Sequence, residues 1–263
     1  NNKLIFKILH LLQKIVYKTS EKIVVISPDM KTQLTKIGVP VEKLVEVKNW
    51  YDEESIKKVP FTENQFAKKY SLSEDFFYVQ YAGNFGYNFD YKMILDIAEK
   101  LKYNQQISFQ MIGDGAFKDE FMEEAQRRGL SNIIFYPWQP LEIINDVYSL
   151  CSIQVIPLTE GVIWNSFPSK GSILMACGSV VLCMTEEDSE YYKELNENEV
   201  GVCVSNRSPE KAAKAITMLY KDRERLATIG KKAEEYATKV YSSTVNVDKL
   251  IKLVQDVHYN NNK

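Results

Sequence analysis

From residue 78 onward, short apolar runs alternate with longer amphipathic stretches. The apolar runs cover residues 78–82, 109–112, 133–136, 153–157, 180–184 and 202–204. The stretches between and after them, at 92–102, 117–128, 141–149, 168–177, 209–219 and 222–240, have the apolar spacing of helices. Continuously apolar strands separated by helices are typical of a parallel sheet covered on both faces. The alternation predicts an α/β fold with a doubly wound, Rossmann-like parallel sheet, in which ligands bind beyond the carboxyl ends of the strands.

The first fifty residues follow the same rhythm with fewer elements. An amphipathic helix is predicted over residues 3–18, a short strand over 22–27, a helix from Ser27 to Gly38 and a strand over 45–49. Two strands and two helices are too few for a closed doubly wound domain. We therefore expect residues 1–50 to be the last segment of an incomplete N-terminal domain. Residues 51–77 would connect it to a second domain at 78–241, and 242–263 would form a C-terminal helix, at about 244–258, and a frayed tail.

Composition and charge argue against several classes of protein. The chain has 263 residues, 45% of them hydrophobic, which is enough for a sizeable core. Its 33 basic and 35 acidic residues leave a net charge of -2, which argues against a partner held by neutralising nucleic-acid phosphates. No C-x-x-C spacing suggests zinc or dithiol chemistry, and the four cysteines indicate buried thiols of a cytoplasmic protein; they are Cys151, Cys177, Cys183 and Cys203.

The helix predicted over residues 3–18 carries lysines apart from its apolar face. A basic amphipathic helix can lie on an anionic membrane surface, so peripheral contact at the inner face of a membrane is one interpretation. Packing of the same face against a protein core is the commoner alternative. No apolar run approaches the roughly 20 residues that a membrane-spanning helix needs.

The clearest candidate for chemistry is Ser166-Phe-Pro-Ser-Lys-Gly171, which lies between the strand ending at Pro157 and a predicted helix. A loop that carries one lysine into a helix presents backbone N–H groups and a cation to a phosphate. Lys170 is the candidate to stabilise negative charge on a departing diphosphate, with Phe167, Pro168 and Ser169 beside it. A solvated surface lysine is the alternative.

Two glycine-containing segments end neighbouring strands of the predicted sheet. Gly83, Asn84 and Gly86 follow the first apolar run, where the backbone can approach a ligand closely or simply turn. Gly113 and Asp114 follow the second, in a partial match to the dinucleotide motif G-x-G-x-x-G. The third glycine is absent, and the next strand offers no acidic residue for a ribose, which argues against a nicotinamide cofactor.

A rigid loop containing Pro137 and Trp138 follows the third strand. Its tryptophan either flanks a nucleobase or packs as a core residue. With these segments assembled, the chain resembles the group 1 family of glycosyltransferases, retaining enzymes of the GT-B fold that build capsule, lipopolysaccharide and other surface glycans. The resemblance extends from about residue 21 to residue 241. It rests on the order and spacing of segments 23–27, 38–43, 47–50, 81–84, 112–115 and 167–170.

The resemblance implies that the predicted sheet is the C-terminal half of a GT-B fold and binds a nucleotide-sugar donor. A glycan or lipid-linked acceptor is the implied second substrate. Gly83, Asn84 and Gly86 would line the cleft, Lys170 would hold the diphosphate, and the loop at 137–138 would flank the base. The implied reaction uses neither a metal nor a cofactor.

The chain departs from the family at two acidic positions. The family usually carries two glutamates eight positions apart, the first near the donor sugar and the second on the ribose, where this chain has Asn165 and Ile173. Asn165 stays a candidate catalytic residue because its amide can bond a sugar hydroxyl, whereas Ile173 cannot accept a hydrogen bond from a ribose. The basic residue often found near 87–90 is also missing, with Lys92 as the nearest substitute. We therefore expect donor binding to depend on Lys170.

Because we expect the N-terminal domain to be incomplete, we also expect little or no transferase activity from these residues alone. Two other interpretations stay open. One is a non-catalytic GT-B half that binds a partner or a membrane, and the other is a nucleotide-sugar epimerase of the same architecture. The nucleotide-sugar interpretation requires that Lys170 and the glycines at 83 and 86 meet in space.

Overall fold

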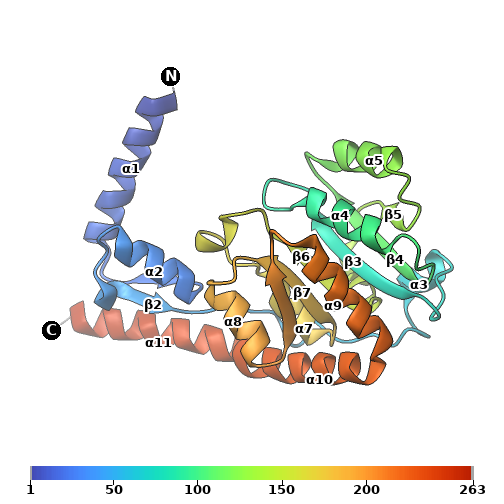
Figure 1. The fold of residues 1–263 in the computed structure, drawn as a ribbon. Helices are drawn as coiled ribbons and strands as arrows, with labels where there is room; N and C mark the ends of the chain where they lie inside the picture. The colour runs from blue at the N-terminus through green and yellow to red at the C-terminus, as the bar shows by residue number, and fades with distance from the viewer. Residues whose placement is uncertain (1, 262–263) are drawn as a thin grey trace.

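The computed structural model describes residues 2–261 and contains a six-stranded parallel sheet (Figure 1). The strand order is β5-β4-β3-β6-β7-β8, so the chain starts at the centre of the sheet and winds first toward one edge and then toward the other. This confirms the doubly wound α/β prediction. The strands are β3 (Phe77–Asn84), β4 (Ile107–Asp114), β5 (Ile133–Tyr136), β6 (Ile153–Pro157), β7 (Val180–Thr185) and β8 (Gly201–Ser205).

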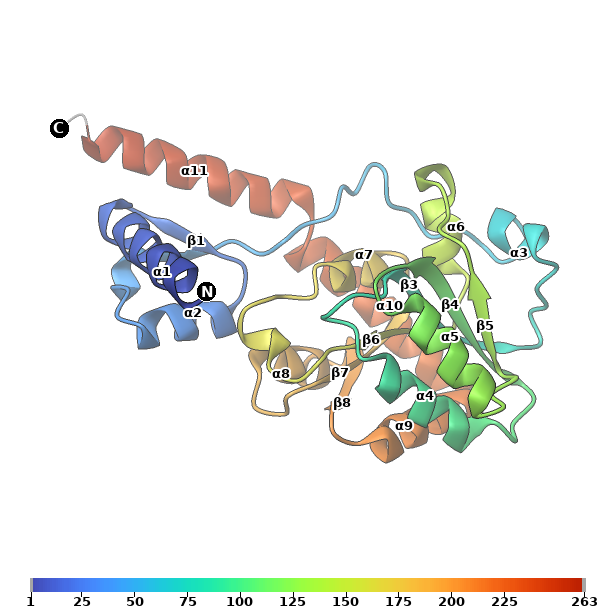
Figure 2. The same ribbon diagram turned by 90° about the horizontal axis from the view of Figure 1, so that it is seen from above.

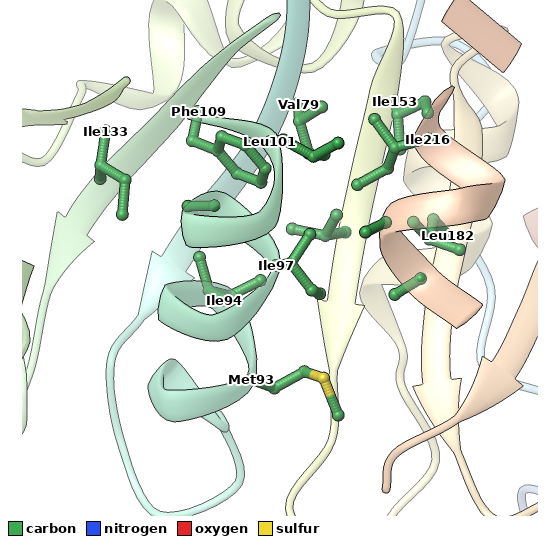
Figure 3. Packing of buried hydrophobic residues seen from close by; sticks show 14 of the residues in the cluster. Val79, Met93, Ile94, Ile97, Leu101, Phe109, Ile133, Ile153, Leu182 and Ile216 are labelled. Atoms are coloured by element: carbon green, nitrogen blue, oxygen red, sulfur yellow. The ribbon is translucent and has the colours of Figure 1, made fainter. Parts of the chain in front are cut away.

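Helices cover both faces of this sheet. One face packs under α4 (Tyr91–Leu101), α5 (Lys118–Arg127) and α9 (Pro209–Lys221). The opposite face packs against α6 (Ile144–Ser149), α7 (Lys170–Ala176) and most of α10 (Arg223–Val240). Figure 3 shows the first layer, where Ile97 of α4 and Ile216 of α9 point toward strand residues such as Val79. Burial of these apolar faces is the main stabilising contribution.

Two short helices are not predicted by the apolar spacing. They are α3 (Gln65–Lys69) and α8 (Glu190–Glu197). In α8 only Tyr191 and Leu195 are buried, and two apolar residues in a polar segment make a weak pattern. Both helices begin with a side-chain cap: Asn64 Oδ1 accepts from the N–H of Ala67 at 2.8 Å, and Ser189 Oγ from that of Tyr192 at 3.2 Å.

The N-terminal part contains α1 (Asn2–Thr19), β1 (Ile23–Val25), α2 (Pro28–Lys36) and β2 (Leu44–Glu46). β1 and β2 pair in parallel as a separate two-stranded sheet, and both are shorter than predicted. A small core of Val25, Val39 and Leu44 holds this part together. Figures 1 and 2 show it beside the six-stranded sheet, with α1 projecting away from the rest of the molecule. The domain boundaries proposed from the sequence stay a prediction.

Polar contacts join the N-terminal part to the large sheet's helices. Asp29 of α2 accepts from the backbone N–H of Glu190 at 3.0 and 3.1 Å, and burial raises the pKa of this carboxyl. Lys48 pairs with Glu194 at 2.7 Å, and the same carboxylate accepts from the hydroxyls of Tyr236 and Tyr241. These contacts fix α8 against the chain that leads into the sheet.

The last helix, α11 (Ser243–Asn261), extends away from the six-stranded sheet toward the side where β1 and β2 lie (Figures 1 and 2). Its first turn is held by Glu53, whose carboxylate accepts from Ser243 and Thr244. These hydrogen bonds to the charged form lower the pKa of Glu53. Within residues 2–261, every helix is too short or too polar to cross a membrane.

Candidate functional site

A cavity of about 810 Å³ opens at the carboxyl ends of the central strands. Its walls come from the ends of β3 and β6, the loop after β3, the loop before α6, and the segment that leads into α7. β3 and β6 are neighbours in the sheet, and the winding direction reverses between them. This reversal is the point where open α/β sheets bind ligands, and the volume suits a small molecule.

Lys170 is the first residue of α7 and reaches across the cavity floor to β3. Its Nζ donates a hydrogen bond to the carbonyl oxygen of Ala82 and lies 4.7 Å from the centre of the Tyr81 ring. Burial alone lowers the pKa of Lys170 to about 8, with no carboxylate contributing. The cavity therefore holds a cation that lacks a counter-charge among residues 2–261.

Gly83 and Gly113 make this close approach possible. They pair with each other at the ends of β3 and β4. A Cβ at Gly83 would overlap Lys170 Nζ, and a Cβ at Gly113, where φ is +138°, would overlap the carbonyl of Gly83. Gly83 and Asn84 thus belong to the strand rather than to a turn after it, and the same holds for Gly113 and Asp114.

Lys170 and the glycine segment lie together, as the nucleotide-sugar interpretation requires. Most of the candidate residues line the cavity: Gly83, Asn84, Gly86, Trp138, Phe167, Pro168, Ser169 and Lys170. Tyr81 supports this arrangement, because its hydroxyl donates to the carbonyl of Asn84 at 2.9 Å while its ring lies beneath the lysine. The lining can present the cation of Lys170 and the amide side chains of Asn84 and Asn88 to an anionic ligand.

Four candidates lie outside the cavity lining: Gly113, Asp114, Pro137 and Asn165. Asp114 is exposed, and its carboxylate accepts from the N–H of Gly115 at 2.8 Å and from Lys118 Nζ at 3.3 Å. Asn165 is exposed at the end of a short turn, η3 (Val162–Trp164), that starts after Gly161 in the left-handed region. Val162 and Ser166 line the wall in its place.

The loop before α6 forms another part of the cavity lining. Trp138 is 60% exposed and lines the cavity beside Leu141. Gln139 braces the loop from below: its Nε2 donates to the carbonyl of Pro137 at 2.7 Å, and its Oε1 accepts from Lys69 at 3.2 Å. The hydrogen bond to the Pro137 carbonyl therefore holds the loop in place, and the exposed ring of Trp138 is accessible to a flat ligand.

Sequence reasoning missed several lining residues. Tyr81 and Tyr148 both line the cavity, and burial raises the pKa of each, that of Tyr148 to about 12. Tyr81 lies in the apolar run 78–82 and Tyr148 in the predicted helix 141–149, and in both places the pattern predicts a tyrosine of the core. The one available signal was a phenol near the end of each element. Lys92, the substitute considered for the missing basic residue, lies outside the cavity, 5.8 Å from the centre of the Tyr91 ring.

In the described part of the chain, no three His, Cys, Asp or Glu side chains are grouped so as to hold a metal ion. The four cysteines are buried free thiols. Metal-independent transfer stays a prediction.

A family model described as "Glycosyl transferases group 1" matches residues 62–236. The chain belongs to this family. Among curated relatives of this group 1 family member, the probable glycosyltransferase WbjE of Pseudomonas aeruginosa is 25% identical over 198 residues, which cover 74% of this chain and 48% of WbjE. The putative colanic acid biosynthesis glycosyl transferase WcaI of Escherichia coli K12 is 22% identical, covering 63% and 40%.

Solved structures agree with the GT-B interpretation of the fold. Anabaena HepE, in complex with UDP and glucose, superposes with a TM-score of 0.81 at 16% identity, covering 94% of this chain and 66% of HepE. The C-terminal domain of the group 1 protein LpcC from Francisella tularensis has a TM-score of 0.61 at 17% identity and covers 73% and 99%. By comparison, the chain spans about half the length of the curated relatives it matches.

Proposed function

We propose that this chain is the donor-binding part of a glycosyltransferase that moves a sugar from a nucleoside diphosphate to a surface polysaccharide or lipid-linked acceptor. Membership of the family supports sugar transfer as the reaction. The complex of HepE with UDP-glucose supports a nucleotide-sugar donor, and the name of WcaI, a putative colanic acid biosynthesis glycosyl transferase, supports a role in polysaccharide synthesis. The retaining stereochemistry is proposed from the family resemblance.

One observation carries this proposal. Lys170 Nζ lies in the cavity with a backbone carbonyl as its hydrogen-bond partner, and no carboxylate of residues 2–261 compensates its charge. An ammonium removed from water without a counter-charge is unfavourable, and an anion that enters the cavity relieves this cost. A diphosphate supplies the negative charge and the acceptor oxygens that are missing around the Lys170 ammonium group. We assign to Lys170 the stabilisation of the leaving diphosphate.

Isothermal titration of UDP, GDP and dTDP into the wild-type chain and Lys170→Ala tests this function. We expect at least one nucleotide to bind, and the substitution to weaken its binding by about 1–3 kcal/mol. Lys92→Ala is the matched control, because Lys92 is an exposed lysine outside the cavity. Equal affinity of Lys170→Ala and the wild type would reject the assignment.

We expect the acceptor site to need more residues than the small N-terminal part provides. The two-stranded sheet of β1 and β2 is small, and its helix α1 exposes large apolar side chains such as Leu4 and Phe6, each 67% exposed. We therefore expect donor binding without efficient transfer. Turnover by this chain with a donor and acceptor would contradict that expectation, and interconversion of the sugar without an acceptor would favour the epimerase alternative.

A further inference from the structure

The charge on the cavity lining is of one sign. Among the described residues that line it, Lys170 alone is charged, and no aspartate, glutamate or histidine reaches the cavity surface. Carboxylates are the strongest side-chain acceptors for hydroxyl groups, and here the available side chains are amides and hydroxyls. The cavity is therefore built for an anion and is poor in groups that grip a diol.

Ile173 occupies the part of the wall next to the lysine. It follows Lys170 by three positions in α7, so the two side chains lie one above the other on the same helix face. Both line the cavity, and α6 packs against α7 with Ile144, Val147 and Tyr148 lining the adjoining wall. This part of the lining is mainly apolar, with the Tyr148 hydroxyl as its polar exception.

The chemistry of the lining residues favours one order for a nucleoside diphosphate. Its diphosphate would lie at Lys170 and Gly83, and its base would stack on Trp138, which lines the same cavity and is 60% exposed. The pentose, which joins the two, would then contact the apolar lining next to the lysine, formed by Ile173 and the α6 residues. A pentose hydroxyl that faces an aliphatic side chain loses its water without gaining a partner, which is unfavourable.

We propose that Ile173 makes this site indifferent to the 2′-hydroxyl, so that it accepts 2′-deoxyribonucleoside diphosphates at least as well as ribonucleoside diphosphates. The donor class then includes sugars carried on a deoxynucleoside diphosphate such as dTDP. This inference depends on the proposed function, because it takes the nucleotide orientation from Lys170 and Trp138.

The test compares UDP with 2′-deoxy-UDP, which differ by one hydroxyl. Isothermal titration of each into the wild-type chain should show 2′-deoxy-UDP binding between equally tightly and about 10-fold more tightly than UDP. Ile173→Glu introduces an acceptor at the pentose, so UDP should become preferred by about 10-fold or more. Ile173→Leu keeps the wall apolar and should retain the wild-type ratio. The readout is the ratio of the UDP and 2′-deoxy-UDP affinities, because the carboxylate of Ile173→Glu repels the diphosphate of both ligands equally.

The outcomes separate the two proposals. A wild-type chain that binds UDP more than about 5-fold tighter than 2′-deoxy-UDP overturns this inference and leaves the diphosphate assignment intact. A folded Ile173→Glu whose ratio equals that of Ile173→Leu overturns the placement of the pentose. If neither ligand binds the wild type, the proposed function itself fails and takes this inference with it. A melting curve for each variant shows that it is folded, and the wild-type ratio decides the question if Ile173→Glu is not.

Discussion

The Nζ atom of Lys170 occupies the space where Gly83, if it were any other residue, would place its Cβ. The two residues come from different halves of the sheet, from the helix after β6 and from the end of β3. Their proximity depends on the pairing of β3 with β6 at the centre of the sheet. The absence of a side chain at one residue therefore creates the site of the cation at the other.

Gly83→Ala should weaken nucleotide binding by displacing the ammonium group. We expect a loss comparable to that of Lys170→Ala, about 1–3 kcal/mol, measured by titration of the nucleotide that binds the wild type. If the effect acts through the lysine, adding Gly83→Ala to Lys170→Ala should cause little further loss. Fully additive losses would show that Gly83 contributes independently of Lys170.

Nucleotide affinity should fall as pH rises through the pKa of Lys170. Burial lowers this pKa to about 8, so the free site loses its proton above pH 8 and must regain it to bind a diphosphate. Between pH 7 and pH 9 we expect about a tenfold loss of affinity from this group alone. Lys170→Arg stays charged over this range and should show a flatter profile, whereas Lys92→Ala should match the wild type. Parallel profiles for Lys170→Arg and the wild type would refute this prediction.

Removing the charge of Lys170 should stabilise the free protein. The folded-state pKa of about 8 lies below the ordinary value of 10.5, so the folded chain carries the full cost of the buried charge below pH 8. This cost disappears as pH rises from 8 to 10.5. Lys170→Met should therefore melt higher than the wild type at pH 7, by about 2–4 °C for each kcal/mol relieved, and the difference should shrink at pH 10. A lower Tm for Lys170→Met at pH 7 would mean that the ammonium stabilises the apo fold.

Trp138 should contribute to binding of the base and not of the diphosphate. Its ring is exposed and lines the same cavity as Lys170, where it can stack on a nucleobase. Trp138→Ala should weaken nucleotide binding by about 1–3 kcal/mol, the range measured for base–aromatic stacking. Pyrophosphate should bind this variant as it binds the wild type. Equal losses for both ligands would place Trp138 in a structural role.

The apolar face of α1 should bind anionic lipid if peripheral membrane contact occurs through residues 3–18. The α1 side that contains His10, Lys14 and Tyr17 faces segment 37–43, while residues such as Leu11, 60% exposed, point away. Co-sedimentation with vesicles of phosphatidylglycerol and phosphatidylcholine, compared with phosphatidylcholine alone, measures this contact. We expect Leu11→Asp to reduce sedimentation with the anionic vesicles. Equal recovery of the variant and the wild type would favour coverage of this face by protein.

The strand pattern was predictable wherever burial on both faces left an uninterrupted apolar run. The predicted bounds of β6 equal those observed, because all five of its residues are buried between the two helical layers. Those of β5 also agree, although this edge strand leaves Ile134 exposed. The helix α8 was not predictable from periodicity, because its buried contacts reduce to Tyr191 and Leu195. Its position depends on tertiary contacts with Asp29 and Lys48, which come from far away in the sequence.

The site was predictable where a glycine or a charged residue stands at the end of a predicted strand or the start of a predicted helix. Gly83 and Lys170 each stood at the end of a recognisable strand or the start of a helix, so the sheet topology brought them together. Asn165 shows the limit of positional reasoning, because the turn after Gly161 leaves its side chain in solvent. Tyr81 shows another limit, since its contact with Lys170 depends on packing that no local pattern reveals.

The central claim is that Lys170 and the end of β3 hold a diphosphate, and a crystal structure of the chain with bound UDP tests it most directly. We predict a diphosphate oxygen within about 2.7–3.2 Å of Lys170 Nζ, next to Gly83 and with the uracil at Trp138. A nucleotide bound elsewhere, or one whose diphosphate points away from Lys170, would contradict it.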